Sequence, residues 1–224
     1  MKQITFTPMF EMVLDSIRQA ITSGAWQAGE LLSHEELANR LQVSRMPVRE
    51  AVRLLEQEGF VTIRRNVGIE VLPLSWDDFE EIYLMRQALE SLAGRLAAPL
   101  LGDADLAYMN ELLEGMAVLL DEGAHETSAT LKLTQQFHST LYAPCGKKKL
   151  LKTIDTLRHH STRYRAFVVQ LPGREQELLK EHSGIYQACL SHDPDEVASR
   201  LHEHFGKALA LAAAQKDVLE VALP

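Results

Sequence analysis

Two arginines four residues apart, Arg45 and Arg49, follow directly on Ser44, a residue of the type that often precedes a helix. Residues at this spacing share one helix face, and a helix N-terminus offers unpaired N–H groups and a positive dipole end to a phosphate. Arginine also forms paired hydrogen bonds with guanine in the major groove of DNA. The spacing therefore indicates a DNA-binding helix. The alternative interpretation of each arginine is an ordinary exposed helix with ion pairs.

The elements expected around this helix have the order of a helix-turn-helix. Ser33 with Glu36 three residues later forms a capping-box pattern, which predicts that a first helix begins there. After a short turn, Ser44 is a second N-cap, and Pro47 falls in the first turn of the next helix, where its missing N–H costs little. Gly59 is of the type that ends a helix in the left-handed conformation.

A β-hairpin is expected directly after the second helix. Residues 60–64 and 69–71 are rich in β-branched side chains. The turn between them contains Asn66 and Gly68, and such a turn between two β-branched runs is typical of a hairpin.

Arg64 and Arg65 would lie on this hairpin, within reach of the DNA backbone or the minor groove. The pattern thus predicts a winged helix-turn-helix DNA-binding domain over residues 1–73. Its expected DNA-binding residues are Ser44, Arg45, Pro47, Arg49, Arg64, Arg65, Asn66 and Gly68.

Three histidines, His138, His182 and His204, lie in three separate stretches of helical periodicity. Each is followed by an apolar residue at helical spacing, so each imidazole is expected at mid-helix. Neutral imidazole is the commonest protein ligand for zinc and related metals, and three imidazoles leave coordination positions open for water or a ligand. Periodicity alone also allows histidines that are hydrogen-bonded in a core or exposed to solvent.

Helical periodicity dominates the chain after Pro73, which ends the wing, and Ser75, which can cap a helix with an acidic first turn. Leu, Ile, Ala and Val recur at three- and four-residue steps. The predicted fold class is mostly α: the winged helix-turn-helix with its small β wing, followed by an all-α six-helix bundle as a second domain over residues 76–216. The six expected helices span residues 76–98, 103–121, 126–143, 147–170, 174–191 and 193–215.

Length, charge and cysteine content fit two small domains. The net charge of −8 lies mainly in the second, because residues 1–75 hold 8 Lys and Arg against 9 Asp and Glu, and the remainder holds 15 against 22. Local clustering of positive charge, rather than net charge, then decides DNA binding. Cys145 and Cys189 lack CxxC spacing and indicate free thiols. Without a long apolar run or a signal core, a cytoplasmic location with no membrane span is expected.

Residues 21–71 resemble the winged helix-turn-helix of the GntR family of bacterial transcription regulators. The resemblance is carried by Gly24, Gly29, Leu32, Leu37-Ala38, Val43-Ser44-Arg45, Pro47-Val48-Arg49-Glu50-Ala51, Leu54-Leu55, Glu58-Gly59 and Asn66-Val67-Gly68. A proline usually precedes the glycine at position 29, where this chain has Ala28. We expect a slightly looser turn there and no change of function.

Residues 76–209 resemble the ligand-binding domain of the FadR subfamily, specifically the FCD type. The matching features are Arg86 with Glu90, Phe137-His138, Glu181-His182, Ile185 and His204. The resemblance implies a divalent metal, zinc or nickel, bound by His138, His182, His204 and an aspartate four residues before the first histidine. This chain has Thr134 at that position, which leaves the metal to three histidines with water or with the effector itself.

Together the two resemblances imply a ligand-responsive regulator, not an enzyme, which acts as a repressor and binds a palindromic operator as a homodimer. The expected effector is a small carboxylate near the histidines and Thr134, with its charge met by the metal, by Arg86, or by Arg163 and Arg165 on the fourth bundle helix. A metal-sensing regulator is one alternative. A metal-dependent hydrolase is another, although no carboxylate is placed as its general base.

Overall fold

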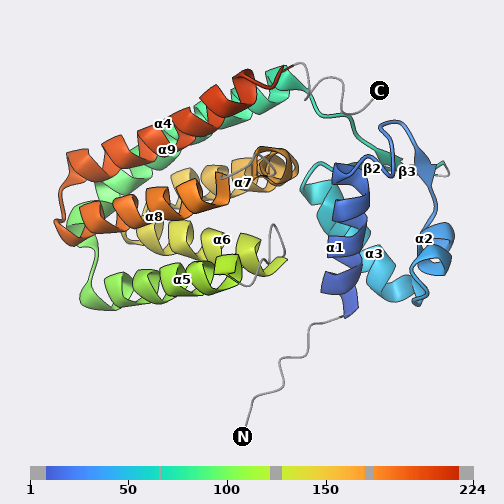
Figure 1. The fold of residues 1–224 in the computed structure, drawn as a ribbon, viewed down its shortest axis with the longest axis horizontal. Helices are drawn as coiled ribbons and strands as arrows, with labels where there is room; N and C mark the ends of the chain where they lie inside the picture. The colour runs from blue at the N-terminus through green and yellow to red at the C-terminus, as the bar shows by residue number, and fades with distance from the viewer. Residues whose placement is uncertain (1–8, 66, 122–127, 170–173, 217–224) are drawn as a thin grey trace, which may run out of the picture. The chain divides into compact units, whose positions relative to one another are not determined.

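The chain divides into two compact units, with the boundary between Ser75 and Trp76 in the sequence (Figure 1). The computed structural model describes residues 9–65, 67–121, 128–169 and 174–216. The side chains of Thr22, Ser128 and residues 165–169 lie outside this description. The first unit is a winged helix-turn-helix and the second is a bundle of helices, so the predicted fold class is confirmed.

Three helices and three strands form the described part of the first unit. They are α1 Met9–Thr22, β1 Leu31–Leu32, α2 His34–Arg40, α3 Arg45–Gln57, β2 Val61–Arg64 and β3 Gly68–Val71. The strands make an antiparallel sheet in the order β1-β3-β2. The two helices of the motif and the hairpin agree with the sequence analysis, which did not anticipate α1 or β1.

The ends of the two motif helices follow from local chemistry. The Ser33 side chain accepts a hydrogen bond from the Glu36 backbone N–H at 3.0 Å, so the expected cap of α2 is present. Ser44 precedes α3 in an extended conformation, but its side chain makes no capping hydrogen bond. Pro47 is the third residue of α3, where no backbone donor is lost from the helix. Gly59 follows α3 with a φ of 75°, the left-handed conformation expected of it.

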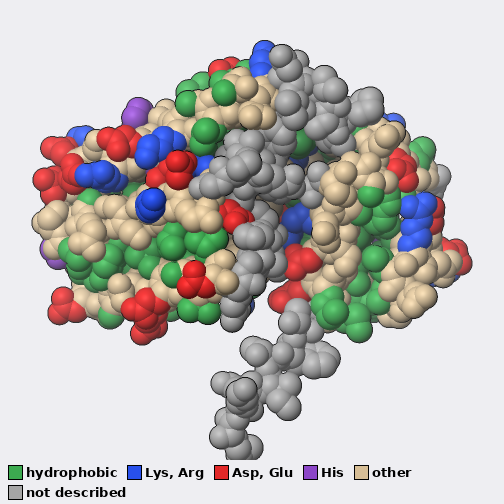
Figure 2. All heavy atoms as spheres, in the orientation of Figure 1, with side chains coloured by type: hydrophobic (Ala, Val, Ile, Leu, Met, Phe, Trp, Pro, Cys, Tyr) green, Lys and Arg blue, Asp and Glu red, His purple; other side chains and the backbone are tan. Residues whose placement is uncertain are grey.

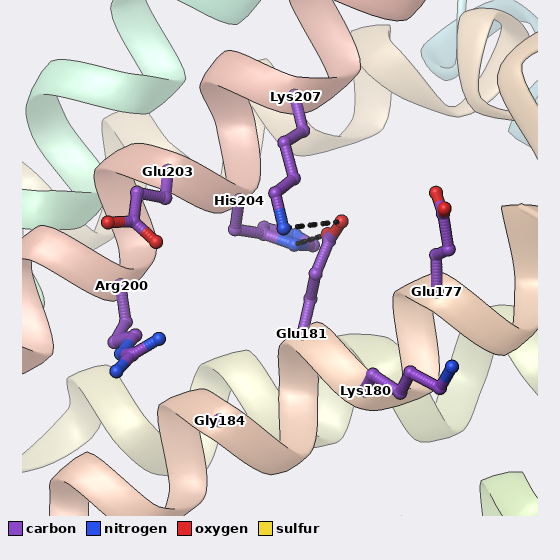
Figure 3. Close-up of a pocket in the computed structure, with 8 residues that line it drawn as sticks. All are labelled: Glu177, Lys180, Glu181, Gly184, Arg200, Glu203, His204 and Lys207. Carbon is purple, nitrogen blue, oxygen red and sulfur yellow. Dashed lines mark hydrogen bonds and ion pairs between the residues drawn. The ribbon is translucent and has the colours of Figure 1, made fainter.

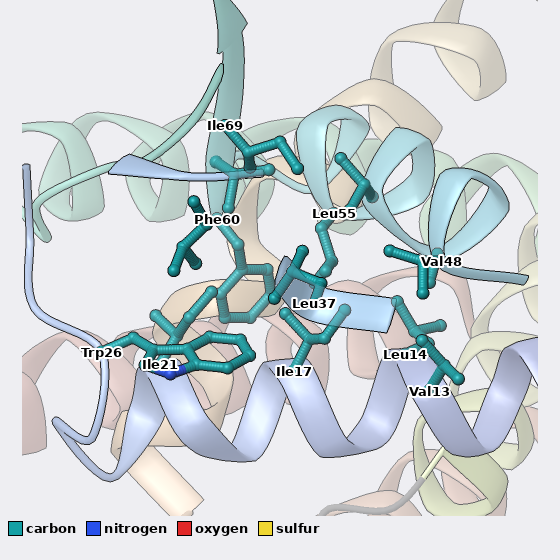
Figure 4. Packing of buried hydrophobic residues seen from close by; sticks show 14 of the residues in the cluster. Val13, Leu14, Ile17, Ile21, Trp26, Leu37, Val48, Leu55, Phe60 and Ile69 are labelled. Carbon is teal, nitrogen blue, oxygen red and sulfur yellow. The ribbon is translucent and has the colours of Figure 1, made fainter. Parts of the chain in front are cut away.

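One apolar core joins the three helices to the sheet (Figure 4). Leu37 of α2 and Val48 and Leu55 of α3 are fully buried, and Ile69 of β3 closes the core from the sheet side. Helix α1 completes it with Val13, Leu14, Ile17 and Ile21. The apolar faces of α2 and α3 are buried in this core, so their polar faces remain on the surface.

Gly68 is required where the wing meets β1. Its φ is 145°, and a Cβ at this position would lie 2.7 Å from the carbonyl oxygen of Leu32. No side chain fits in that space, so only glycine allows β3 to begin against β1.

The second unit is an all-α bundle over the residues that the structure describes. Its helices are α4 Trp76–Ala97, α5 Asp103–Asp121, α6 Ser128–Tyr142, α7 Lys148–Val169, α8 Arg174–Leu190 and α9 Pro194–Ala213, with 3₁₀ turns η1 Ala98–Leu100 and η2 Ala143–Cys145. Each predicted bundle helix is found, with its ends shifted by a few residues at most. Asp193 caps α9 by accepting hydrogen bonds from the N–H groups of Asp195 and Glu196 at 2.9 and 3.2 Å.

Helices α4 and α9 lie side by side along most of their length (Figure 1). Gly94 permits this approach, because a Cβ there would lie 2.2 Å from the side chain of Leu201. Helix α4 also packs against α7 and α6, α5 packs against α6 and α8, and α8 packs against α9. Helices α4, α6, α8 and α9 therefore border the interior in which the three histidines meet.

The surface of the bundle is mixed in charge. On the face drawn in Figure 2, Lys and Arg alternate with Asp and Glu over the upper helices, and hydrophobic side chains gather lower down, over α5. Cys145 and Cys189 are both buried free thiols, as expected from their spacing.

None of the helices in the described ranges combines the length and the apolar character needed to cross a bilayer.

Candidate DNA-binding surface and metal centre

Helix α3 presents Arg45 and Arg49, from its first two turns, to solvent. The helix buries Val48, Val52 and Leu55 in the core, and Arg45 and Arg49 remain exposed. Arg45 forms an ion pair with Glu35 at 2.7 Å, with 63% of one side chain and 66% of the other exposed. Ion pairs this exposed contribute about 0–1 kcal/mol, so a phosphate or a base could replace Glu35 at little cost.

The wing arginines are also exposed. Arg64 pairs across the hairpin with Glu70, and 59% of its side chain remains accessible. Arg65 is exposed at the end of β2, whereas Asn66 lies outside the described residues. Sequence reasoning overlooked Met46, which is 67% exposed between Arg45 and Pro47. Its place in the sequence, directly between Arg45 and Pro47, was the available signal.

A buried ion pair fixes α1 to the end of α3 beneath this surface. One terminal nitrogen of Arg18 donates to both carboxylate oxygens of Glu58, at 2.8 and 2.9 Å, and the other donates to Asp15 at 3.0 Å. Arg18 and Glu58 are 6% exposed each. The pair holds the framework of the candidate DNA-binding helix without taking part in its exposed face.

In the second unit, the structure brings His138 of α6, His182 of α8 and His204 of α9 together. They are 2%, 2% and 8% exposed, and one ring nitrogen from each lies within 4.8 Å of the others. The Nε2 atoms of His138 and His182 are 3.1 Å apart. Two nitrogens bound tetrahedrally to one zinc ion lie about 3.3 Å apart, given Zn–N bonds of about 2.0–2.1 Å. The three rings are therefore close to the spacing that a shared ion requires.

A chain of hydrogen bonds orients His138 from behind. The Tyr142 hydroxyl donates to Glu90 at 2.9 Å, so it accepts the Nδ1–H of His138, which lies 3.0 Å away. Nδ1 then carries the proton, and Nε2 keeps the lone pair that a metal needs. Sequence reasoning overlooked Tyr142, although its place one turn after His138 was a usable signal.

Glu90 in turn is paired with the buried cation of the bundle. The Arg86 Nε donates to Glu90 at 2.7 Å, and another nitrogen of Arg86 donates to the Ser161 hydroxyl at 2.9 Å. The guanidinium also lies 4.7 Å from the centre of the Phe205 ring. Proximity to the Glu90 carboxylate raises the pKa of Arg86 despite its burial, so its charge is permanent and already matched.

His204 is oriented from the opposite side by a carboxylate. Its Nδ1 donates to Glu181 at 2.7 Å, and Arg174 donates to the same carboxylate at 2.6 and 3.2 Å. Burial opposes the charge of Glu181, but the hydrogen bonds from His204 and Arg174 prevail and lower its pKa to about 2. Metal-binding histidines commonly donate their second nitrogen to a carboxylate in this way. Arg174 is a further residue that sequence reasoning missed.

Burial lowers the pKa of His204 and holds that of His138 well below its usual range. The neighbouring histidines and Arg86 act on His138 in the same direction. Neutral imidazoles with oriented lone pairs are the donor set that zinc and nickel prefer, so the residues fit the metal that the family resemblance implies.

Thr134 lies one helical turn before His138, at the position where the family resemblance implies an aspartate. It is 9% exposed, and its hydroxyl donates to the backbone carbonyl of Thr130 at 3.1 Å. A neutral hydroxyl that is hydrogen-bonded to its own helix gives a metal ion neither the negative charge nor the strong oxygen ligand of a carboxylate. Of the four ligands that the family resemblance implies, this chain therefore has the three histidines.

The other candidate effector residues lie apart from the histidine cluster or outside the description. Arg163 donates to Asp78 at 2.6 Å and to the Tyr164 hydroxyl at 2.7 Å, close to the start of α4. Asp78 precedes Arg86 by eight residues, which is about 12 Å along a helix. The side chain of Arg165 is among those that the structure leaves undescribed.

A pocket of about 340 Å³ lies between α8 and α9 (Figure 3). Its lining residues are Glu177, Lys180, Glu181, Gly184, Arg200, Glu203, His204 and Lys207. Figure 3 shows His204 and Lys207 both reaching Glu181, the latter at 3.7 Å. The pocket thus contacts the Nδ1 side of His204, opposite to the nitrogen that would bind a metal.

Comparison with known proteins agrees with this geometry. Residues 10–71 match the bacterial regulatory proteins of the gntR family, and residues 81–207 match the FCD domain. The uncharacterized HTH-type transcriptional regulator YdhC of Bacillus subtilis (strain 168) is 30% identical over 68% of this chain and 69% of its own length. The gluconate operon transcriptional repressor of Bacillus licheniformis is 29% identical over 63% of this chain and 57% of its own.

Among solved structures, E. coli McbR/YncC superposes with a TM-score of 0.68 over 94% of this chain and 100% of its own, and at 22% identity it supports the fold alone. The matched domains lie in the same order as the two units described above. The exposed arginines of α3 and the three buried histidines occupy the two parts that such a regulator uses for DNA and for its signal. The chain belongs to the GntR family of bacterial transcription regulators, with an FCD domain as its second unit, and this is not a family of enzymes.

Proposed function

We propose that this chain is a repressor that binds a palindromic operator as a homodimer and senses a small carboxylate through a divalent metal ion, zinc or nickel. Family membership supports the regulator assignment, and relatives named as repressors support the sign of the response. The observation that carries the sensing part is the convergence of three buried imidazoles, each from a different helix.

In this proposal α3 enters the major groove, and the arginines of its first two turns contact bases or phosphates. Arg45 and Arg49 are exposed, and the core beneath them is independent of their side chains. Arg64 and Arg65 of the wing would contact the backbone or the minor groove. A homodimer presents two such surfaces to the two halves of a palindrome, which is how helix-turn-helix proteins match the symmetry of their sites.

His138, His182 and His204 would hold the metal through their Nε2 atoms. When bound, the ion supplies a fixed positive charge with open coordination positions that attract an anionic oxygen. Tyr142 and Glu181 hold the outer nitrogens of His138 and His204, so two of the three ligands are oriented before any ion arrives.

Thr134 gives the reason for a carboxylate effector. Three neutral imidazoles leave the double charge of the ion unmatched in a buried site, and an unmatched buried charge is costly. An aspartate at position 134 would offset part of that charge, but threonine does not. The charges of Arg86 and Arg163 are matched by Glu90 and Asp78. The metal is therefore the cation that an entering carboxylate would meet.

Binding of the metal and binding of the effector should then each increase the affinity of the protein for the other. If the effector supplies the missing anionic ligand, each raises the affinity for the other by the same factor, as thermodynamic linkage requires. A ligand that favours one arrangement of the bundle helices can also shift the population of DNA-binding states. Operator affinity would follow the joint occupancy of the site.

Titration of zinc into the purified protein, with and without a panel of small mono-, di- and tricarboxylates, tests this proposal. Zinc affinity should rise about tenfold or more with the best carboxylate, and operator affinity should change only when both are present. The Thr134→Asp variant should bind zinc more tightly alone and gain less from the carboxylate. Thr134→Asn, which has the same shape without the charge, is the matched control and should behave like the wild type.

Zinc titration that detects no binding to the wild type would exclude the metal part of the proposal. A best ligand that is uncharged or cationic would exclude the carboxylate, and the regulator assignment would stand.

One further observation favours a second candidate, a metal sensor: the three rings are at most 8% exposed, so the ion could fill the site alone. A change in operator affinity produced by zinc without any carboxylate would select that function.

A further inference from the structure

The outward face of α3 has an apolar side chain at its centre. Successive residues of an α-helix lie about 100° apart around its axis. On that geometry the buried Val48 and Leu55 are about 160° and 180° away from Met46 around the helix, so the Met46 position is opposite the core. Among the large apolar side chains of the described residues, none is more exposed than that of Met46, at 67%.

The charged residues at the start of α3 lie to either side of Met46. Arg49 is about 60° away on one side and Glu50 about 40° away on the other, and both are exposed. Arg45 is about 100° away, on the Arg49 side, where it pairs with Glu35 of α2 at 2.7 Å. A helix in the major groove turns the centre of its outward face to the base edges and its flanks to the backbones. Met46 would therefore meet the bases.

The chemistry of a thioether limits what Met46 can contact there. It has no charge and is only a weak hydrogen-bond acceptor, so it gains little from a phosphate or from the polar atoms of the bases. The apolar group that the major groove offers is the C5 methyl of thymine. An unbranched, polarisable side chain can adapt its shape to such a group.

From the position of Met46 we infer that this side chain reads a thymine in each half of the operator, by contact with the C5 methyl group of that base. The inference rests on the proposed function in one respect, which is that α3 has to enter the major groove. It goes beyond it by assigning a base to a residue that neither carries a charge nor donates a hydrogen bond.

Other exposed apolar side chains of the first unit do not fit this role. Val67, on the turn of the wing, is 58% exposed. The wing would reach the backbone or the minor groove, and base edges in the minor groove carry no methyl group. Met12 is 55% exposed on α1, the helix whose apolar side chains pack beneath α3. Met12 is therefore a matched control for Met46.

Selection of duplexes from a random-sequence pool by the full chain supplies the DNA for the test. The selected half-site should contain a thymine whose replacement by deoxyuridine, which removes the methyl group alone, weakens binding. Exposing about one methyl group to water corresponds to about a fourfold loss of affinity per half-site. Replacing the thymine in both half-sites should then cost about 15-fold.

Variants assign this loss to one side chain. Met46→Ala should weaken binding to the thymine duplex about as much as the two deoxyuridines do, and it should bind the deoxyuridine duplex about as well as the wild type does. Such non-additivity is expected of two groups in direct contact. Alanine is a better helix former than methionine, so the melting temperature should change little. Met12→Ala should retain the full difference between the two duplexes.

A second probe keeps the methyl group and changes the base. Replacing the thymine–adenine pair by cytosine–guanine should weaken binding of the wild type. 5-Methylcytosine at the same position carries its methyl group at the same place in the groove and should recover about fourfold per half-site. Met46→Ala should bind the duplexes with cytosine and with 5-methylcytosine equally.

A wild type that is indifferent to deoxyuridine at every thymine of the selected duplex would overturn the inference. A difference between the two duplexes that persists in Met46→Ala would also overturn it, because another residue would then contact the methyl group. In both cases the DNA-binding part of the proposed function would stand if Arg45→Ala or Arg49→Ala still weakened binding. A wild type that selects no duplex would overturn that proposal and this inference together.

Discussion

The candidate functional residues are exposed in the first unit and buried in the second. In the first, Arg45 and Arg49 stand on the surface above an apolar core that does not depend on them. In the second, His138 and the residues that orient it are the core itself: Glu90 is fully buried, and Arg86 is 6% exposed. Exposed charges cost little stability to change, whereas a buried polar network must be matched partner by partner. Function and stability should therefore separate in the first unit and coincide in the second.

The largest expected effect is on stability, at Glu90. Glu90→Ala leaves the Arg86 guanidinium charged and buried without its carboxylate, and it removes the acceptor of the Tyr142 hydroxyl. Loss of one partner of a buried ion pair typically costs about 3–5 kcal/mol. Urea unfolding of the chelated protein measures this change. An unfolding free energy within about 1 kcal/mol of the wild type would show that the network is not the structural centre of the bundle.

Metal-dependent stability should be lost on changing one histidine. An ion that binds only the folded state stabilises it by about 4 kcal/mol when its free concentration is 1,000 times the dissociation constant. His182→Ala should abolish this gain, seen as a zinc-dependent rise in melting temperature. His202→Ala changes an exposed histidine of α9 and is the matched control. A zinc response that survives in His182→Ala would place the ion elsewhere.

Changes on the surface of the first unit should act on DNA alone. Arg45→Ala and Arg49→Ala should each cost about 1–3 kcal/mol of operator affinity if the contact is bidentate, and about 0.5 kcal/mol or less of stability. Mobility-shift titration and thermal melting measure the two quantities. Arg200→Ala, an exposed arginine of the second unit, is the control. Unchanged operator binding in both α3 variants would remove this helix from the DNA interface.

The sequence predicted well those features that neighbouring residues determine. Ser33 with Glu36, Gly59 and the β-branched hairpin each act within a few residues, and the structure has the helix start, the helix end and the wing where these signals place them. The six bundle helices followed from periodicity for the same reason. Strand β1 was not anticipated, because it has two residues and exists only through its pairing with β3. Helix α1 was missed as well.

Contacts between helices could not be derived in the same way. Periodicity placed His138, His182 and His204 at mid-helix, but only the family resemblance suggested that they meet. Tyr142 and Glu90 are 52 residues apart, and no local pattern links them. Arg163 looked available for an effector, and the structure pairs it with Asp78, 85 residues away. Such pairings depend on how helices pack, which composition and spacing leave open.

The last expected effect is a pH dependence of stability that the buried histidines of the second unit should produce. Burial lowers the pKa of His138 and His204, so both stay neutral in the folded protein at pH values where the unfolded chain binds protons. Stability therefore falls as the pH drops below about 6.5, by up to about 1.4 kcal/mol per pH unit for each histidine. Glu181 adds to the fall at lower pH: its stabilising charge is complete above the unfolded pKa of 4.5 and is lost toward its folded pKa of about 2.

Melting of the chelated protein between pH 7.5 and 5.5 checks this slope. His138→Leu should flatten it, because the unfolded chain then has one proton fewer to gain, whereas an exposed histidine replaced in the same way, His202→Leu, should not. Arg45→Ala should leave the slope unchanged, since changes on the surface of the first unit should act on DNA alone. A melting temperature that is constant or rises toward pH 5.5 would mean that the histidines are charged in the fold, and a charged imidazole has no lone pair to give a metal. The pH slope therefore tests the metal site and the contrast between the two units in one measurement.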